Sequence, residues 1–262
     1  MIIMEPSATD SDKMRFALLI DAENARPTLI DSVIDEVGKY GYIIIKRIYG
    51  DFTMPNMNPW KKVVTDLAIQ PVLQLHNVSG KNSSDFAMTI DAMDILYSKE
   101  IDAFCLVSSD SDFTRLVTRL RENGKFVMGV GKKGTSSSLV NACNVFVFTE
   151  ILESTEKEAK SKIRTPKRES LKSDELNLIL DRAYEMCEQE DGTARLTCIG
   201  ISIRKINPGF DARAYGYTKL KGLFEALNEK FGLEQVNTED NVPVYFVRRL
   251  RHDHDSSVQA DQ

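Results

Sequence analysis

The stretch Ile101–Phe113, IDAFCLVSSDSDF, decides the fold predicted for this chain. Its apolar part, AFCLV, has the composition of a strand that is buried on both faces of a sheet. Two carboxylates, Asp110 and Asp112, follow almost at once, and apolar residues then return at helical spacing, so we expect Ser109 or Ser111 to cap a helix. One acid in this place is explained by helix capping alone. Two acids beside a strand end are typical of a ligand site in an open α/β sheet.

Strand-like runs alternate with amphipathic helical patterns throughout the first half of the chain. The expected strands are 15–20, 42–49, 71–75, 101–107, 125–130 and 144–148. This alternation predicts an α/β fold with a doubly wound, mainly parallel sheet and right-handed crossovers. For the helix that begins near residue 83, we expect a buried side made of Phe86, Ile90, Met93, Ile95, Leu96 and Tyr97.

Carboxylates recur where the expected strands end or the next helices begin. Asp21 follows the first strand, Asp85 opens the helix after the third, and Asp110 and Asp112 follow the fourth. The first and fourth strands of such a sheet are neighbours, so we expect these four acids in one cleft. Clustered carboxylates repel one another unless a hard cation lies between them. Because no histidine or cysteine accompanies them, Mg²⁺ or Mn²⁺ is favoured over zinc, and either ion can activate water and neutralise phosphate charge.

Composition and charge limit the classes of function. The 262 residues suit one large domain or two modest ones, and the net charge of −5 requires any nucleic-acid binding to come from local basic patches. The four cysteines form no CxxC pair, and we interpret them as reduced, buried thiols of a cytoplasmic protein. No run approaches the roughly 18 apolar residues of a membrane span, and the acidic first 14 residues lack the pattern of a signal peptide. We therefore expect no membrane association.

Four ordered motifs resemble those of the NYN family of PIN-like nuclease domains. They are IDAEN at 20–24, GKNSSD at 80–85, SSDSDF at 108–113 and GTSSSLVNACNVFVF at 134–148. The resemblance implies a metal-dependent endoribonuclease that hydrolyses phosphodiester bonds. Carried over position by position, it implies metal ligands at Asp21, Asp85, Asp110 and Asp112, and a catalytic role for these acids and for Asn24. Asp91 lies where many members have a further acid.

Two other functions compete with this interpretation. PIN-like domains also act as scaffolds, so the alternative is a non-catalytic RNA-binding regulator or adaptor with a vestigial nuclease site. A phosphatase of the haloacid dehalogenase type would also place an aspartate after the first strand. That chemistry needs a second acid two residues later in a DxD motif, whereas this chain has DAEN at 21–24.

The second half of the chain has a different character. Charges run from 153 to 170 with a proline among them, which predicts a solvated linker. Three helical patterns, the last at 215–227, and two short alternating runs then predict a winged helix. The segment 191–227 resembles the OST-HTH/LOTUS family, which implies RNA binding or docking to another protein. The expected boundaries are a flexible N-terminus at 1–13, the PIN-like domain at 14–152, the linker at 153–170, the smaller winged-helix domain at 171–249 and a flexible tail at 250–262.

Basic residues in both domains are candidates for contacts with RNA, either single-stranded or structured. The candidates are Lys81, Lys132, Lys133, Arg213, Lys219 and Lys221. In the loop 131–138, ammonium groups and backbone amides beside the acids after the fourth strand would hold a phosphate, although a solvated loop explains the same residues equally well. The preference for RNA over DNA follows from the resemblance alone.

Overall fold

The structure is a computed structural model that describes residues 13–74, 83–160, 173–237 and 243–250. The chain divides into two compact units, Met1–Arg164 and Thr165–Gln262. Each unit has its own core. Within the described ranges, no helix is long and apolar enough to cross a membrane.

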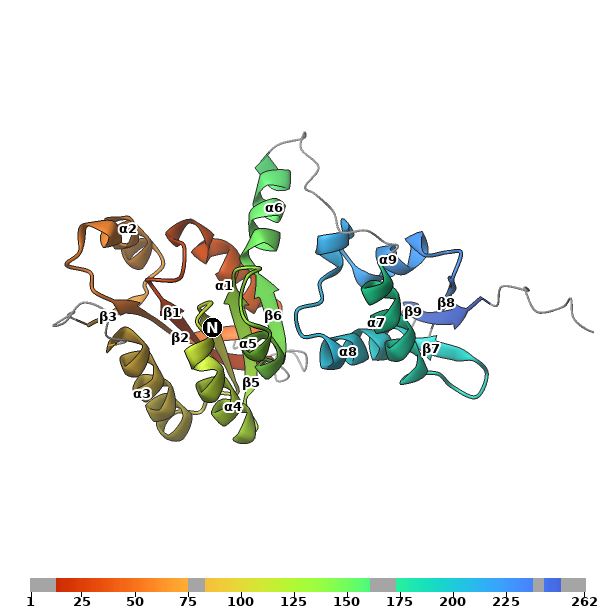
Figure 1. Ribbon diagram of the computed structural model, residues 1–262, viewed down its shortest axis with the longest axis horizontal. Helices are drawn as coiled ribbons and strands as arrows, with labels where there is room; N and C mark the ends of the chain where they lie inside the picture. The colour runs from red at the N-terminus through yellow and green to blue at the C-terminus, as the bar shows by residue number, and fades with distance from the viewer. Residues whose placement is uncertain (1–12, 75–82, 161–172, 238–242, 251–262) are drawn as a thin grey trace, which may run out of the picture. The chain divides into compact units, whose positions relative to one another are not determined.

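The first unit is built on a six-stranded parallel sheet with the strand order β3-β2-β1-β4-β5-β6 (Figure 1). The strands are β1 (Met14–Asp21), β2 (Gly41–Gly50), β3 (Gln70–Leu73), β4 (Ala103–Val107), β5 (Phe126–Gly131) and β6 (Val145–Phe148). The first strand therefore lies at the centre beside the fourth, which confirms the doubly wound arrangement expected from the sequence.

Helices cover both faces of this sheet (Figure 1). They are α1 (Ile30–Gly38), α2 (Asn58–Asp66), α3 (Ser83–Ser98), α4 (Thr114–Glu122), α5 (Ser137–Ala142) and α6 (Thr149–Lys160). In β1, Phe16, Leu18 and Ile20 pack with α1, α2 and α6, whereas Ala17 and Leu19 pack with α3, α4 and α5. Successive side chains of a strand point to opposite faces, so a continuous apolar run serves two cores at once.

Helix α3 differs from its expected orientation. Ile95 and Leu96 are buried and Met93 is half-buried, but Phe86, Ile90 and Tyr97 are 70%, 61% and 65% exposed. The helix is apolar on almost every side, so periodicity could not show which side faces the sheet. The prediction that these three side chains belong to the core was wrong.

The second unit combines helices with a three-stranded antiparallel sheet of order β7-β9-β8. Its elements are α7 (Asp174–Glu185), β7 (Thr193–Arg195), α8 (Leu196–Ile206), α9 (Leu220–Ala226), β8 (Phe231–Asn237) and β9 (Pro243–Arg249). The expected hairpin is present, and β7 adds a third strand to it. The third helix begins later than predicted: Ala212–Tyr215 forms a separate 3-10 turn that ends at Gly216, whose φ of 88° breaks the helix.

Two further expectations require correction. Cys187 and Cys198 form a disulfide, with their Cα atoms 5.9 Å apart, whereas Cys105 and Cys143 are free and buried. The interpretation of all four cysteines as reduced thiols was therefore wrong, because chain folding across α7 and α8 brings together two residues that sequence spacing alone does not pair. Helix α6 continues to Lys160, so the described part of the expected linker is helical. Its TEKEAK segment consists mainly of good helix formers.

Candidate active site

The candidate site begins where β1 and β4 end side by side. Ile20 pairs with Val107, so the next residues, Asp21 and Ser108, meet at the carboxyl edge of the sheet. The Ser108 hydroxyl donates a hydrogen bond of 2.8 Å to Asp21 Oδ2. Open α/β sheets bind ligands at the point where the strand order reverses. In this sheet, that point lies between β1 and β4.

Asp21 is 2% exposed and is held by hydrogen bonds on both carboxylate oxygens. Oδ1 accepts from the backbone amides of Glu23 at 3.1 Å and Asn24 at 3.3 Å, and Oδ2 accepts from Asn24 Nδ2 at 2.7 Å as well as from Ser108. Four hydrogen bonds therefore use both acceptor oxygens of this buried carboxylate and fix its orientation. Asn24 therefore orients the Asp21 carboxylate.

The two acids after β4 lie in the turn that starts α4. Asp110 Oδ1 accepts from the Asp112 backbone amide at 2.9 Å, and Asp110 is the N-cap of the 3-10 turn Ser111–Phe113. The expectation that Ser109 or Ser111 caps this helix was wrong, since the Ser109 hydroxyl instead accepts from the backbone amide of Lys132 at 2.9 Å. One oxygen of Asp110 is thus used in capping.

Asp85 connects α3 electrostatically with the other acids. Burial, and then the negative charges of Asp21, Asp110, Glu23 and Asp112, raise the pKa of Asp85 from 3.8 to about 6. A carboxylate responds in this way only to like charges within short range, since water and salt screen distant ones. The acids of three separate chain segments therefore share one electrostatic environment.

The donor set has the chemistry that a hard divalent cation requires, because every charged group in it is a carboxylate. In the part of the chain that the structure describes, however, no three His, Cys, Asp or Glu side chains are grouped closely enough to hold a metal ion. Both oxygens of Asp21 and one oxygen of Asp110 accept hydrogen bonds from within the protein. The residues fit such an ion in type, although they are not gathered into a coordination shell.

Sequence reasoning missed two members of this environment. Glu23 acts on the Asp85 carboxyl and accepts a hydrogen bond of 3.0 Å from the Ser84 hydroxyl, which links the segment after β1 to the start of α3. Ser108 fixes Asp21. A signal was present for both, because Glu23 lies two residues after Asp21 and Ser108 is the first polar residue after its strand.

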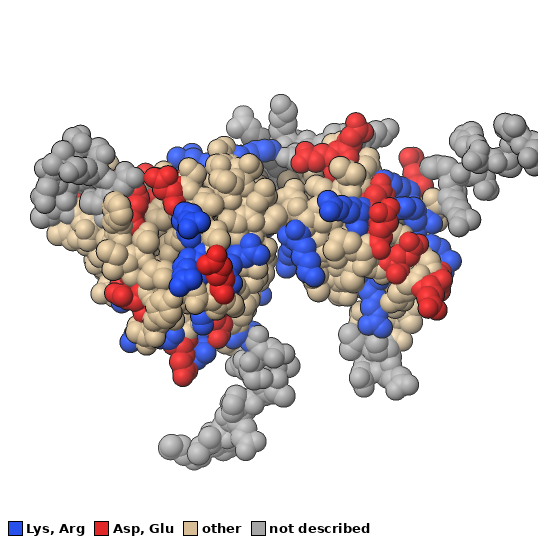
Figure 2. All heavy atoms as spheres, turned by 60° about the horizontal axis from the view of Figure 1, so that its bottom comes forward, with Lys and Arg blue, Asp and Glu red and all other residues tan. Residues whose placement is uncertain are grey.

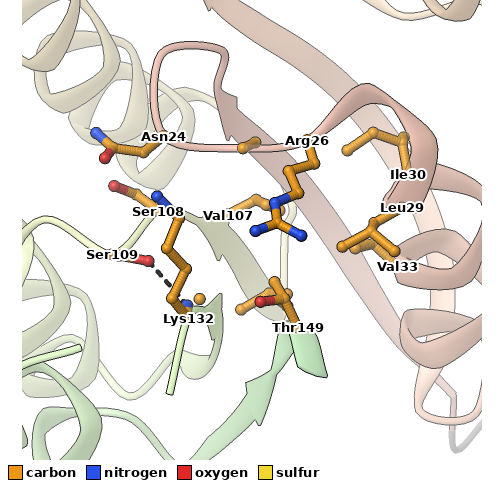
Figure 3. A pocket seen from close by; sticks show the side chains of 13 residues that line it. Asn24, Arg26, Leu29, Ile30, Val33, Val107, Ser108, Ser109, Lys132 and Thr149 are labelled. Carbon is orange, nitrogen blue, oxygen red and sulfur yellow. Dashed lines mark hydrogen bonds between the residues drawn. The ribbon is translucent and has the colours of Figure 1, made fainter. Parts of the chain in front are cut away.

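Lys132 lies near Asn24 and Ser108, the two residues whose side chains donate to Asp21. It lines a pocket with Asn24, Arg26, Ser108 and Thr149, and its side chain extends toward Ser108 and Asn24 (Figure 3). Ammonium groups bind phosphate, which is the role predicted for Lys132 from the sequence.

Of the two other lysines predicted for the first unit, the structure describes only Lys133. The backbone amide of Lys133 donates to both carboxylate oxygens of Glu150 at 3.0 Å. Lys81 lies outside the described residues.

Asp91 makes contacts that hold the fold together. It accepts from Arg47 Nη1 at 2.5 Å and from the Tyr49 hydroxyl at 2.6 Å, so it fastens α3 to β2. Burial and the Asp91 carboxylate raise the pKa of Tyr49, which keeps its hydroxyl protonated as a donor. The structure does not bring Asp91 into contact with the acids at the strand ends.

The basic residues predicted to bind RNA in the second unit differ in their exposure and in the contacts of their charged groups. Arg213 is only 18% exposed and donates through Nε and Nη2 to Asp211, whereas Lys219 is exposed just before α9. Lys221 lies over the Tyr245 ring at 4.3 Å. On the face seen in Figure 2, acidic and basic side chains are interspersed on both units.

These features define a class: a PIN-like α/β domain with acids at the carboxyl edge of its sheet, followed by a small domain with its own sheet. The sequence matches the NYN domain over residues 15–153 and the OST-HTH/LOTUS domain over residues 152–243, in that order. The chain belongs to the NYN domain family and carries an OST-HTH/LOTUS domain after it. This pair of domains supports a nuclease or RNA-binding role.

Individual proteins with similarity to the chain cover part of it. The uncharacterized protein MJ0482 of Methanocaldococcus jannaschii is 25% identical over 150 residues, which are 55% of this chain and 59% of that protein. Protein VPA0982 from Vibrio parahaemolyticus, of unknown function, has a crystal structure with a TM-score of 0.43 at 21% identity, covering 55% of this chain and 94% of that one. The solution structure of an uncharacterized protein from locus NE0665 of Nitrosomonas europaea gives a TM-score of 0.30 at 27% identity, covering 36% and 89%.

Proposed function

We propose that the protein is a metal-dependent endoribonuclease whose site consists of Asp21, Asp85, Asp110 and Asp112. The observation that carries the proposal is that β1 and β4 end side by side with acids of this set at or after their ends; burial, and then the charges of Asp21, Asp110, Glu23 and Asp112, raise the pKa of Asp85. Such repulsion destabilises a folded protein, and a cation bound among the acids would relieve it. A site that is costly without a cation is suited to binding one.

Each residue has a proposed role. Asp21 is the buried anchor of the site, and Asn24 and Ser108 hold it in position through the hydrogen bonds described above. Asp85, Asp110 and Asp112 are proposed to supply further carboxylate ligands from two other segments. We propose Mg²⁺ or Mn²⁺ as the ion, which when bound supplies Lewis acidity that activates water and neutralises charge on the scissile phosphate. RNA is the proposed substrate and the second domain is proposed to capture it.

A second candidate function has one observation in its favour. Both oxygens of Asp21 and one of Asp110 already accept hydrogen bonds, and the described residues offer no preassembled metal group. These contacts would also stabilise a domain that binds RNA without cutting it. The alternative is therefore a non-catalytic RNA-binding regulator, with a protein partner as a further possibility for the second domain.

Cleavage of a labelled single-stranded RNA separates the two functions. The wild-type protein should cut the RNA in Mg²⁺ or Mn²⁺ and should not cut it in EDTA. Asp110→Asn keeps a cap for the 3-10 turn, since asparagine is also a good N-cap, but removes one charge from the site. This variant should bind the RNA and leave it uncut. Binding without cleavage by the wild-type protein in either metal would favour the regulator.

A further inference from the structure

A groove lies beside the candidate active site, between α3 and the open edge of the sheet. Its volume is about 640 Å³, which is within the size range of pockets that bind small ligands. The residues that line it are Arg47, Gln70, Val72, Gln74, Phe86, Ala87, Ile90 and Asp91. All of them belong to the first unit.

The strand order explains why this groove exists. Arg47 pairs with Gln70 and Tyr49 with Val72 in the β2–β3 ladder, so these side chains share the face of the sheet on which α3 packs. Helix α3 is fastened over β2 through Asp91. The strand β3 lies at the edge of the sheet, beyond this contact, and Gln70 is exposed among the residues that the structure describes.

The wall of the groove is unusually apolar for an exposed surface. Phe86 is 70% exposed and Ile90 is 61% exposed, and the two residues are four apart, so they lie on one side of the helix. Large exposed apolar side chains gathered at one place usually mark a binding surface. The floor is polar by contrast, since Gln70 and Gln74 carry amides that donate and accept hydrogen bonds.

The groove begins at the residue that follows Asp85 in α3. Phe86 directly follows Asp85, and consecutive Cα atoms are only about 3.8 Å apart. Asp85 is partly buried in the first turn of α3, whereas Phe86 is exposed at the groove. One wall of the groove therefore starts one residue along α3 from a proposed metal ligand.

The charge of the groove favours an uncharged group over a phosphate. Arg47 is the one cationic residue among those that line the groove. The Asp91 carboxylate neutralises it, with Arg47 Nη1 and Asp91 Oδ1 2.5 Å apart. An aromatic ring, an aliphatic wall and two side-chain amides are what an unpaired nucleobase requires, because its face stacks and its edge forms hydrogen bonds.

We propose that this groove binds one unpaired base of a single-stranded RNA, next to the phosphate at Asp85, with Phe86 as the stacking platform. This inference rests on the proposed function for the identity of the strand. It assigns the substrate as single-stranded at this position, because a base within a duplex does not offer its face for stacking. Gln70 and Gln74 contact the edge of the bound base.

The test is the affinity of the full-length protein for fluorescent single-stranded RNA in EDTA, where no cleavage occurs, with Phe86→Ala compared with the wild type. Phe86→Ala should weaken binding about ten-fold. The matched control is Tyr97→Ala, which removes another exposed aromatic ring from α3 outside the groove and should bind as the wild type does. Fluorescence of the single tryptophan, Trp60, in urea checks that each variant folds.

A second set of RNAs gives the result specific to the groove. A series with one abasic nucleotide, moved along the strand, should contain one position at which the wild type and Phe86→Ala bind equally well. Equal affinity of the two proteins for the intact RNA would overturn the inference, as would an effect of Phe86→Ala that persists at every abasic position. If Phe86→Ala instead abolished self-association in sedimentation without changing RNA affinity, the groove would be an interface with a second copy. Because binding is read without cleavage, these outcomes are distinct from failure of the nuclease proposal.

Discussion

Replacing Asp85 with asparagine should stabilise the first unit at neutral pH. Burial and the charges of Asp21, Asp110, Glu23 and Asp112 raise the pKa of this carboxyl from 3.8 to about 6. At about 1.4 kcal/mol per pH unit, the upper limit of the cost of ionising it is about 3 kcal/mol. The carboxyl is partly exposed, so solvent screening reduces the expected gain in the free energy of unfolding to about 1–2 kcal/mol.

The pH dependence of that gain follows from proton linkage. Between about pH 4 and pH 6 the folded protein binds a proton at Asp85 more tightly than the unfolded chain does, so wild-type stability falls as pH rises through this window. Asp85→Asn lacks that dependence. Its advantage should be full above about pH 6 and should disappear below about pH 4.

Urea unfolding followed by Trp60 fluorescence measures the effect in the correct unit, because the chain has one tryptophan and it is 2% exposed in the first core. The control is Asp94→Asn, which removes an exposed acid from the same helix and should change stability little at any pH. A loss of stability in Asp85→Asn at pH 7.5, or an advantage that does not change between pH 4 and pH 7.5, would refute the argument that the acids repel one another.

Three further predictions test neighbouring parts of the account. Asp21→Asn should lower the free energy of unfolding by about 1–3 kcal/mol in the same urea assay, because the new amide faces donors where a carboxylate accepts four hydrogen bonds; unchanged stability would contradict it. Joint replacement of Lys132 and Lys133 by alanine should weaken RNA binding and reduce its salt dependence, measured by anisotropy, and an unaltered slope would indicate that neither contacts phosphate. Thiol titration of the denatured, unreduced protein should detect two thiols, whereas four would contradict the Cys187–Cys198 disulfide.

The sequence was sufficient for the sheet but not for every helix. Buried parallel strands consist of continuous apolar runs, and the run AFCLV in β4 is an example. Helix α3 is different, because large apolar residues such as Phe86 and Ile90 lie on its exposed side as well as on its buried side. Hydrophobic periodicity orients a helix by separating an apolar side from a polar side. It cannot orient a helix that carries large apolar residues on both sides.

The candidate site was predictable in its position and less so in its contacts. The order of the strands requires Asp21 and the acids after β4 to lie on one edge, which the sequence pattern already indicated. It could not show that Asn24 and Ser108 bond to Asp21, or that Asp110 caps its own turn, because these depend on side-chain orientation within a few ångströms. The disulfide depends in the same way on where α7 and α8 meet.

Calorimetric titration with Mn²⁺ tests the central claim most directly, because it measures the cation site without requiring the correct RNA. The wild-type protein and Asp94→Asn should bind Mn²⁺ with the same affinity, and Asp110→Asn should bind it at least about ten-fold more weakly, since the variant loses one carboxylate of the shared set. Equal Mn²⁺ affinity in the wild type and Asp110→Asn, or no binding by the wild type, would contradict the assignment of these acids as a metal site.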